Sequence, residues 1–222
     1  MCCRCWVPNP QSPVLTRLDL PGAPSRWEEL GFSISSDGVE IGQVGCRLGA
    51  TEAGWGFDSG EVTIPGIPAI ATTDGAPAPT SRPAGIHANG AFKIDHVVVA
   101  SDDPQTTKSQ LESFGFVGKG ERLFGDAEAQ RSQTFFWSGD LLLELVGPAR
   151  QSIGGASCAQ IWGVTFVTPD FVGLERTAGA LLGPARPAVQ PGRQICIVGA
   201  GAGIGLQIAF LTPHLNRPEP KN

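Results

Sequence analysis

Tyrosine is absent from this sequence, and its 222 residues include only 3 histidines and 1 methionine. The absence of tyrosine removes one common general acid or base from consideration. Charged residues make up 17% of the chain, the net charge is −5, and neither sign forms a long run. Nothing in this balance favours nucleic acid or an anionic membrane as a partner.

Long apolar runs and a disulfide framework are also missing. No apolar segment reaches the roughly 18 residues of a membrane-spanning helix, and the first residues lack the apolar core of a secretory signal. Three of the 6 cysteines (Cys2, Cys3 and Cys5) crowd the start, and the others lie far apart. We therefore expect a cytoplasmic protein with reduced thiols. The cysteine cluster could bind a soft metal, but it lacks a second ligand pair, and a frayed terminus is the simpler interpretation.

Glycine (30) and proline (19) are abundant, which favours short elements joined by many turns. The composition and the pattern of apolar residues together predict five segments. They are an N-terminal tail (1–13), a degenerate β-α-β-β-β module (14–58), a Pro/Gly-rich linker (59–92), a pair of modules (93–213) and a C-terminal tail (214–222). In the linker, His87 is interpreted as an exposed loop histidine.

The segment 93–148 has the clearest pattern. It opens with a strand that carries His96 near its start, followed by Asp103-Pro104, a typical helix start. Gly115 is expected to end the helix. Strands are expected at 117–123, 133–137 and 141–146, the last two joined by a Ser-Gly-Asp hairpin turn. Glu144 interrupts the otherwise apolar last strand.

Two repeats of this pattern follow from the sequence. Residues 160–170 parallel 93–103, and a helix is expected over 171–182, so 160–213 forms a second module. WEELGF (27–32) echoes LESFGF (111–116), which supports a degenerate first copy.

The segments IDHVVVASDD (94–103), the helix ending in Phe-Gly-Phe (114–116) and LLLELVGP (141–148) resemble the vicinal oxygen chelate superfamily. That superfamily includes glyoxalase I, bleomycin-resistance proteins and extradiol dioxygenases. The resemblance implies an α+β fold in which β-α-β-β-β modules form a cupped mixed sheet. It also implies a divalent metal (Zn, Ni, Mn or Fe) bound by His96 and Glu144. A homodimer is a further expectation, because dimers are common in that family.

The second module departs from the ligand pattern of the family. When the modules are aligned, the histidine position falls on Gly163 and the glutamate position on Ala209. Neither residue can bind a metal through a side chain, so two of four expected ligands are missing. A third ligand could come from Gln133, Gln190 or Gln207, or from another chain. Structural alternatives for His96 and Glu144, including a hydrogen bond between them, remain open.

Other residues are candidates for substrate binding. Arg193 and Gln190 flank a Pro-Gly turn, and an arginine there could bind a carboxylate, although a solvated turn explains both equally well. Trp137 and Trp162 could line a pocket, and Gln133 precedes Trp137 on the same strand. Large aromatic residues are nevertheless more often part of a core. The glycine-rich run 198–205 does not match a nucleotide-binding motif, so we expect a flexible hairpin there and no nucleotide cofactor.

Three functions remain open from the sequence. The leading hypothesis is a glyoxalase-like small-molecule enzyme of the lyase, isomerase or dioxygenase type. It would use a metal to chelate vicinal oxygens, or Glu144 as a base. The alternative is a non-catalytic protein that sequesters a small molecule, as in bleomycin resistance, which the missing ligands favour. A third is a structural or interaction module, in which the Pro-rich linker presents the first copy to a partner.

Overall fold

The computed structural model describes residues 12–35, 38–71, 87–126, 128–150 and 157–214. The chain forms two compact units: unit 1 comprises 1–18, 52–78 and 96–162, and unit 2 comprises 19–51, 79–95 and 163–222. The boundary therefore falls within three strands. They are β1 (Leu15–Pro21), β5 (Lys93–Ser101) and β9 (Ala159–Val167). The N-terminal cysteine cluster and much of the linker lie outside the described residues.

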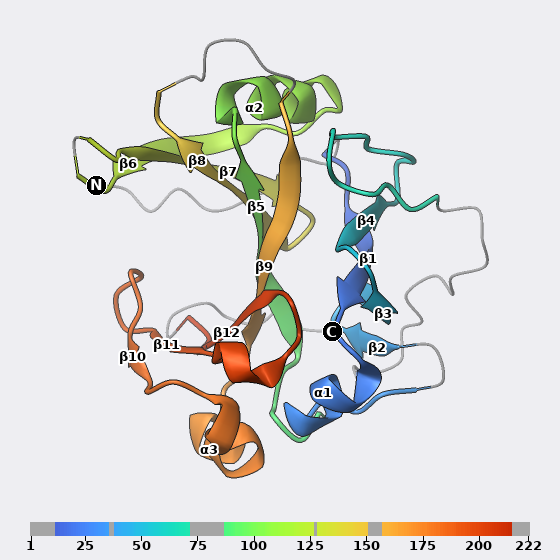
Figure 1. Ribbon diagram of the computed structural model, residues 1–222, viewed down its shortest axis with the longest axis vertical. Helices are drawn as coiled ribbons and strands as arrows, with labels where there is room; N and C mark the ends of the chain where they lie inside the picture. The colour runs from blue at the N-terminus through green and yellow to red at the C-terminus, as the bar shows by residue number, and fades with distance from the viewer. Residues whose placement is uncertain (1–11, 36–37, 72–86, 127, 151–156, 215–222) are drawn as a thin grey trace. The chain divides into compact units, whose positions relative to one another are not determined.

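Unit 1 contains the segment in which the sequence pattern is clearest. After β5 come α2 (Pro104–Ser113), β6 (Gly118–Phe124), β7 (Arg131–Ser138) and β8 (Leu141–Pro148). The strands are ordered β5-β8-β7-β6, with β5 parallel to β8 and the other pairs antiparallel (Figure 1). This is the β-α-β-β-β module that the sequence predicts.

Local signals set the ends of α2. Asp103 caps the helix by accepting a hydrogen bond from the backbone N–H of Thr106 (3.1 Å), and Pro104 occupies the first turn. Gly115 follows with φ 94°, a conformation that glycine adopts without strain. The chain then returns to the core through Phe116, whose backbone N–H donates to the carbonyl of Leu111 (3.2 Å).

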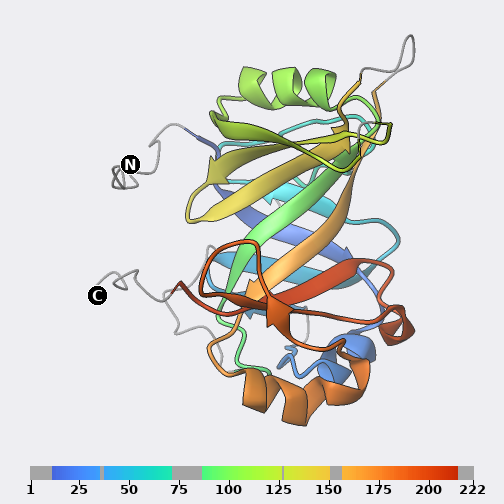
Figure 2. The ribbon, with the colours of Figure 1, turned by 90° about the vertical axis from the view of Figure 1, so that its left-hand side faces the viewer.

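The two faces of this sheet differ. Side chains alternate between faces along a strand, so Val97 and Val99 share one face and His96 and Val98 share the other. Val97 and Val99 are fully buried, as is Phe136 of β7. Figures 1 and 2 show α2 against one side of the sheet. Phe116, which follows α2, packs edge-to-face on Phe136 (6.4 Å between ring centroids). The face with Val97 is therefore the covered face.

Unit 2 repeats the module. After β9 come α3 (Phe171–Ala178), the 3₁₀ helix η1 (Gly179–Leu181), β10 (Arg186–Pro187), β11 (Gln194–Ile197), the 3₁₀ helix η2 (Ala200–Ala202) and β12 (Gln207–Leu211). The strand order β9-β12-β11-β10 has the same topology as β5-β8-β7-β6. The helix is shorter than predicted, because the chain tightens into η1 at Gly179. The glycine-rich run 198–205 contains η2 instead of a simple hairpin.

The first copy has the predicted element order but another strand arrangement. Its further elements are α1 (Pro24–Glu29), β2 (Val39–Ile41), β3 (Val44–Ala50) and β4 (Gly54–Phe57). In unit 2, β3 lies between β2 and β1, and in unit 1 β4 neighbours the first part of β1. Within each of the other modules, the opening strand pairs with the closing strand and not with the strand that precedes the closing strand. The similarity between WEELGF and LESFGF therefore identifies a module whose strands pair differently.

The core of unit 2 corrects one prediction. Trp27, Phe32, Phe166 and Phe210 form a cluster of aromatic contacts, with 5.0 Å between the ring centroids of Phe32 and Phe166. His87 joins this cluster edge-to-face with Phe32 and is only 3% exposed. The prediction of an exposed loop histidine was wrong, because both ring nitrogens of His87 form hydrogen bonds with the backbone.

Within the described residues, no helix has the length and apolar character needed to span a membrane.

Candidate functional site

The open face of the β5-β8-β7-β6 sheet, opposite the face covered by α2, carries a line of polar side chains. Each strand contributes one residue: His96 from β5, Glu144 from β8, Gln133 from β7 and Arg122 from β6. The strand register explains why these four residues lie along a diagonal across the sheet. Glu144 pairs with Val98, which lies two residues after His96. Gln133 pairs with the residue two beyond Glu144 and also with Arg122. Residues paired in this way share a face of the sheet.

Contacts along this line are continuous. Nε2 of His96 lies 3.6 Å from Oε2 of Glu144. The Nε2 amide of Gln133 donates to Oε1 of Glu144, and Nε of Arg122 donates to Oε1 of Gln133. The orientation of the Gln133 amide is thus fixed at both ends. The Glu144 carboxylate is met by an imidazole and an amide, which offsets the cost of holding it on an apolar sheet.

The setting of this line is mostly apolar. The side chains of His96 and Glu144 are 18% and 16% exposed, so a ligand can reach them. Gln133 is only 5% exposed. The neighbours on the same face are Val98, Leu142, Val146, Phe135 and Trp137. Val98 and Val146 are buried, and Leu142, Phe135 and Trp137 are half-buried. A polar group surrounded by aliphatic and aromatic side chains is the usual composition of a small-molecule site.

The second module lacks the corresponding groups, as the sequence alignment predicts. Glu144 pairs with Val98, two residues after His96, and Ala209 pairs with Thr165, two residues after Gly163. The registers therefore make Gly163 and Ala209 the structural equivalents of His96 and Glu144. A Cβ atom on Gly163 would lie 2.8 Å from the carbonyl oxygen of Gln207, so the backbone leaves no room for a side chain there.

The residues present do not complete a metal centre. Three protein ligands plus water are usual for a catalytic metal, and His96 and Glu144 supply two. Gln133, which contacts Glu144, turns its NH₂ group and not its oxygen toward that carboxylate. Within the described residues, no group of three or more His, Cys, Asp or Glu side chains is arranged to hold a metal. This donor set is too small to support a metal-dependent step.

The two tryptophans predicted to line a pocket have different positions. Trp137 lies on β7 two residues after Phe135, which pairs with Glu144, and it therefore shares the face of the polar line. Trp162 is 49% exposed on β9. Because Trp162 and Gly163 are consecutive, they point to opposite faces of that strand. Trp137 is thus brought to the site, whereas Trp162 lies on the other face from the position equivalent to His96.

Gln190 and Arg193 form a structural network in unit 2. Arg193 is 3% exposed, and NH2 donates to Oδ1 of Asp95 (2.7 Å). NH1 donates to Oε1 of Gln190 (2.6 Å) and lies 3.1 Å from Nε2 of His214. Nε donates to the carbonyl of Thr212 (2.6 Å). All three guanidinium nitrogens have hydrogen-bonding partners. The buried side chain therefore connects the segment just before β11 to its neighbours.

Sequence reasoning missed Arg122. It lies within the predicted strand 117–123, but only the register with Gln133 brings it into the line. The alternation of side chains along a strand was an available signal. It places Gly120, Arg122 and Phe124 on the same face of the predicted strand. The register itself depends on a β-bulge between Gly118 and Gly120, which the sequence does not reveal.

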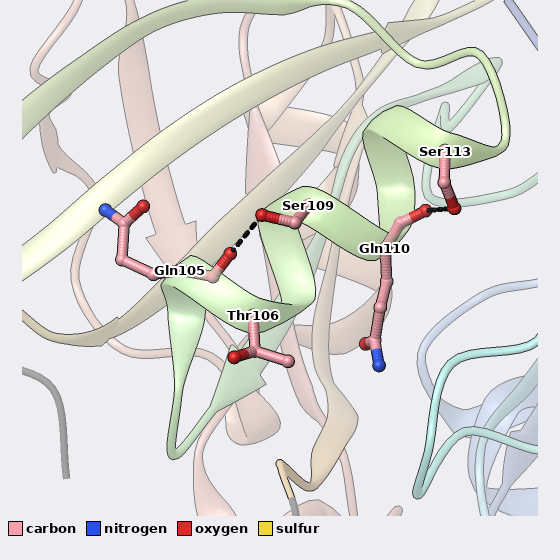
Figure 3. A pocket seen from close by; sticks show the side chains of 5 residues that line it. All are labelled: Gln105, Thr106, Ser109, Gln110 and Ser113. Atoms are coloured by element: carbon pink, nitrogen blue, oxygen red, sulfur yellow. Dashed lines mark hydrogen bonds between the residues drawn. The ribbon is translucent and has the colours of Figure 1, made fainter. Parts of the chain in front are cut away.

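A hollow of about 460 Å³ lies elsewhere, on the outer surface of α2. Its lining residues all come from this helix: Gln105, Thr106, Ser109, Gln110 and Ser113 (Figure 3). Two of its serines satisfy their hydroxyl groups within the helix, through the carbonyls of Gln105 (3.0 Å) and Gln110 (2.6 Å). All five side chains are uncharged, so the hollow offers no group for acid–base or metal chemistry.

The strand topology decides the fold. Two modules share the strand order in which the opening strand pairs in parallel with the closing strand, and His96 and Glu144 lie on those two strands of one module. The fold is of the vicinal oxygen chelate type. The α+β architecture predicted from the sequence is thereby confirmed.

Several solved structures are similar to this chain. One is methylmalonyl-CoA epimerase from Mycobacterium tuberculosis, at 14% identity and TM-score 0.42, covering 56% of this chain and 90% of that chain. Another is a variant of the Streptomyces coelicolor methylmalonyl-CoA epimerase in complex with 2-nitronate-propionyl-CoA, at 17% identity and TM-score 0.42, covering 59% and 99%. A hypothetical protein from Bacillus halodurans matches at 13% identity and TM-score 0.41, covering 59% and 98%. No protein family model and no curated protein matches the sequence.

Proposed function

We propose that this protein is a glyoxalase-like small-molecule enzyme in which Glu144 accepts a proton from carbon next to a carbonyl group. One observation supports this most directly: the Glu144 carboxylate lies on the open apolar face, held by His96 and Gln133, and remains 16% exposed. A carboxylate held in place beside a hydrophobic surface is a suitable general base.

In this proposal, Glu144 is the catalytic residue. The proton of a substrate C–H passes to the carboxylate, and the electron pair of that bond moves onto the adjacent carbonyl oxygen as an enolate. Return of a proton to carbon then gives exchange, isomerisation or epimerisation. His96 and Gln133 are positioning residues, because each contacts the carboxylate and limits its rotation. The neighbouring aliphatic and aromatic side chains would exclude water from the enolate.

The acid–base proposal and the metal-chelate hypothesis require different sets of residues. A divalent metal would polarise the carbonyl and stabilise the enolate, and His96 and Glu144 would be its ligands. That role needs at least one more ligand, and the equivalents in the second module are Gly163 and Ala209. The acid–base role needs only Glu144 and the two residues that contact it, His96 and Gln133.

Deuterium exchange tests the proposal. Ketones and keto acids with acidic C–H groups are incubated in D₂O with the protein, and loss of the proton signal is followed by NMR. We expect exchange above background for the wild type and a loss of 100-fold or more, on the order expected for removing a general base, in Glu144→Gln. The control is Glu121→Gln, because Glu121 lies on β6 but pairs with Thr134 on the covered face. Equal rates for the wild type and Glu144→Gln would refute the proposal.

A second candidate is a binding protein without turnover, of the bleomycin-resistance kind. The absence of side-chain ligands at Gly163 and Ala209 favours it, since a sequestering protein needs an apolar face and not a complete catalytic centre. Saturable binding without exchange in any compound would select this candidate. If the protein shows neither binding nor exchange, the structural or interaction module is the remaining candidate. A homodimer and a cytoplasmic location remain predictions under all three.

A further inference from the structure

Arg122 forms the outer end of the polar line and has unused donors. Its Nε donates to Oε1 of Gln133. Its two terminal nitrogens make no hydrogen bond to any residue in the described part of the chain. A guanidinium carries five N–H donors in a fixed fork, so four of them can serve a ligand. Two parallel N–H groups of such a fork match the two oxygens of a carboxylate.

The position of this guanidinium is held by its neighbours. Gln133 is 5% exposed and is fixed at its other end by Glu144. The centre of the Arg122 guanidinium also lies 6.0 Å from the centroid of the Phe124 ring, within the range of a cation–π contact. An arginine held from two sides loses less conformational entropy when it binds an anion than a free surface arginine does.

Space for a ligand exists beside this arginine. Gly120 lies two residues before Arg122 and shares its face of β6. A Cβ atom built on Gly120 would meet no atom within 4 Å. On the other side, Phe124 is 39% exposed and offers an apolar wall. The edge of the sheet therefore presents a guanidinium between an open space and an aromatic ring.

The distance between Arg122 and Glu144 restricts the ligand. Only the amide of Gln133 separates them, and one amide with two hydrogen bonds of about 2.9 Å spans about 8 Å at most. A ligand that reaches both groups must therefore carry its anionic group within a few bonds of the reacting carbon. A monoanion is favoured over a dianionic phosphate, because Glu144 and the net charge of −5 repel further negative charge.

We propose that the substrates are small aryl or alkyl keto acids, with Arg122 binding the carboxylate and the acidic C–H group lying at Glu144. This inference rests on the proposed role of Glu144 as proton acceptor. Arg122 is then the residue that selects acids over neutral ketones.

Matched ligand pairs test the inference. A panel of keto acids, such as 4-oxo-4-phenylbutanoate, is compared with the corresponding neutral keto amides by calorimetry and by deuterium exchange. We expect the acids to bind the wild type about 10- to 100-fold more tightly than the amides, the range for a hydrogen-bonded charge pair. Arg122→Gln should remove this preference, and Arg122→Lys should restore part of it, since lysine keeps the charge but not the fork. Arg150→Gln, an exposed change outside the strands, should have no effect.

The outcomes separate this inference from the proposed function. If acids and amides bind equally, or if the preference for acids persists in Arg122→Gln, the inference is overturned whatever the exchange shows. Exchange that depends on Glu144 but not on the carboxylate leaves the proposed function standing without this substrate class. A preference for acids that depends on Arg122, without any exchange, supports the binding role and refutes the acid–base role of Glu144.

Discussion

Gln133 is the best place to test the polar line, because it joins Arg122 to Glu144. Gln133→Leu keeps nearly the same side-chain volume and removes both hydrogen bonds. The bond to Arg122 contributes little, because Arg122 is exposed and water can replace Gln133. The bond to Glu144 matters more, because that carboxylate is only 16% exposed. Hydrogen bonds to charged groups contribute about 1.5–3 kcal/mol, and the added apolar contact of leucine offsets part of the loss. We expect a net decrease of about 1–2 kcal/mol in the free energy of unfolding.

Urea denaturation at neutral pH measures this decrease, with Gln105→Leu as the control. Gln105 is exposed on α2, so its replacement should change stability by less than about 0.5 kcal/mol. A double-mutant cycle with Glu144→Leu should give a coupling of about 1 kcal/mol between the two sites. Additive effects in this cycle would refute the contact between Gln133 and Glu144, and with it the continuous line across the sheet.

Two predictions concern the buried polar groups outside this line. The Nδ1 atom of His87 accepts from the backbone N–H of Ser33 (3.1 Å), and burial lowers the pKa of His87 below its usual 6.5, so the imidazole is neutral in the folded protein. Below about pH 6.5 the unfolded chain therefore binds more protons than the folded protein. Stability should fall as pH drops below this value, more in the wild type than in His87→Gln, and parallel stability–pH curves would contradict this. Ser138, fully buried, accepts from the N–H of Leu15 and donates to the carbonyl of Pro13 (both 2.8 Å). Ser138→Ala should lower the free energy of unfolding by about 2–4 kcal/mol in urea titrations, against less than about 0.5 for the exposed Ser113→Ala, and a loss no larger than that of the control would argue against this anchor.

Much of the module could be predicted from the sequence because its signals are local. The Asp-Pro helix start, the glycine after α2 and the Ser-Gly-Asp turn each fix the backbone within a few residues. The proximity of His96 and Glu144 was implied by the family resemblance, and the pairing of the opening strand with the closing strand explains it. The absence of a complete ligand set was equally visible, since Gly163 and Ala209 carry no donor.

The remainder depends on contacts between distant segments. The role of Arg122 requires the register of three strands and a bulge, and a shift of one residue would place it on the covered face. The burial of His87 follows from backbone partners at Ser33 and Glu40, far away in the sequence. Arg193 was expected either to bind a carboxylate or to lie in a solvated turn, but four neighbours form hydrogen bonds with its guanidinium group. Composition and spacing contain none of this information.

Deuterium exchange into keto acids, measured with and without a metal chelator, tests the central claim most directly. The claim is that Glu144 accepts a proton on the open sheet face with no help beyond the residues in contact with it. It predicts exchange that persists in the chelator and disappears in Glu144→Gln, while Glu121→Gln behaves as the wild type. Exchange that the chelator abolishes and an added divalent metal restores, with loss of that metal in His96→Ala, would contradict the claim and establish a metal centre instead.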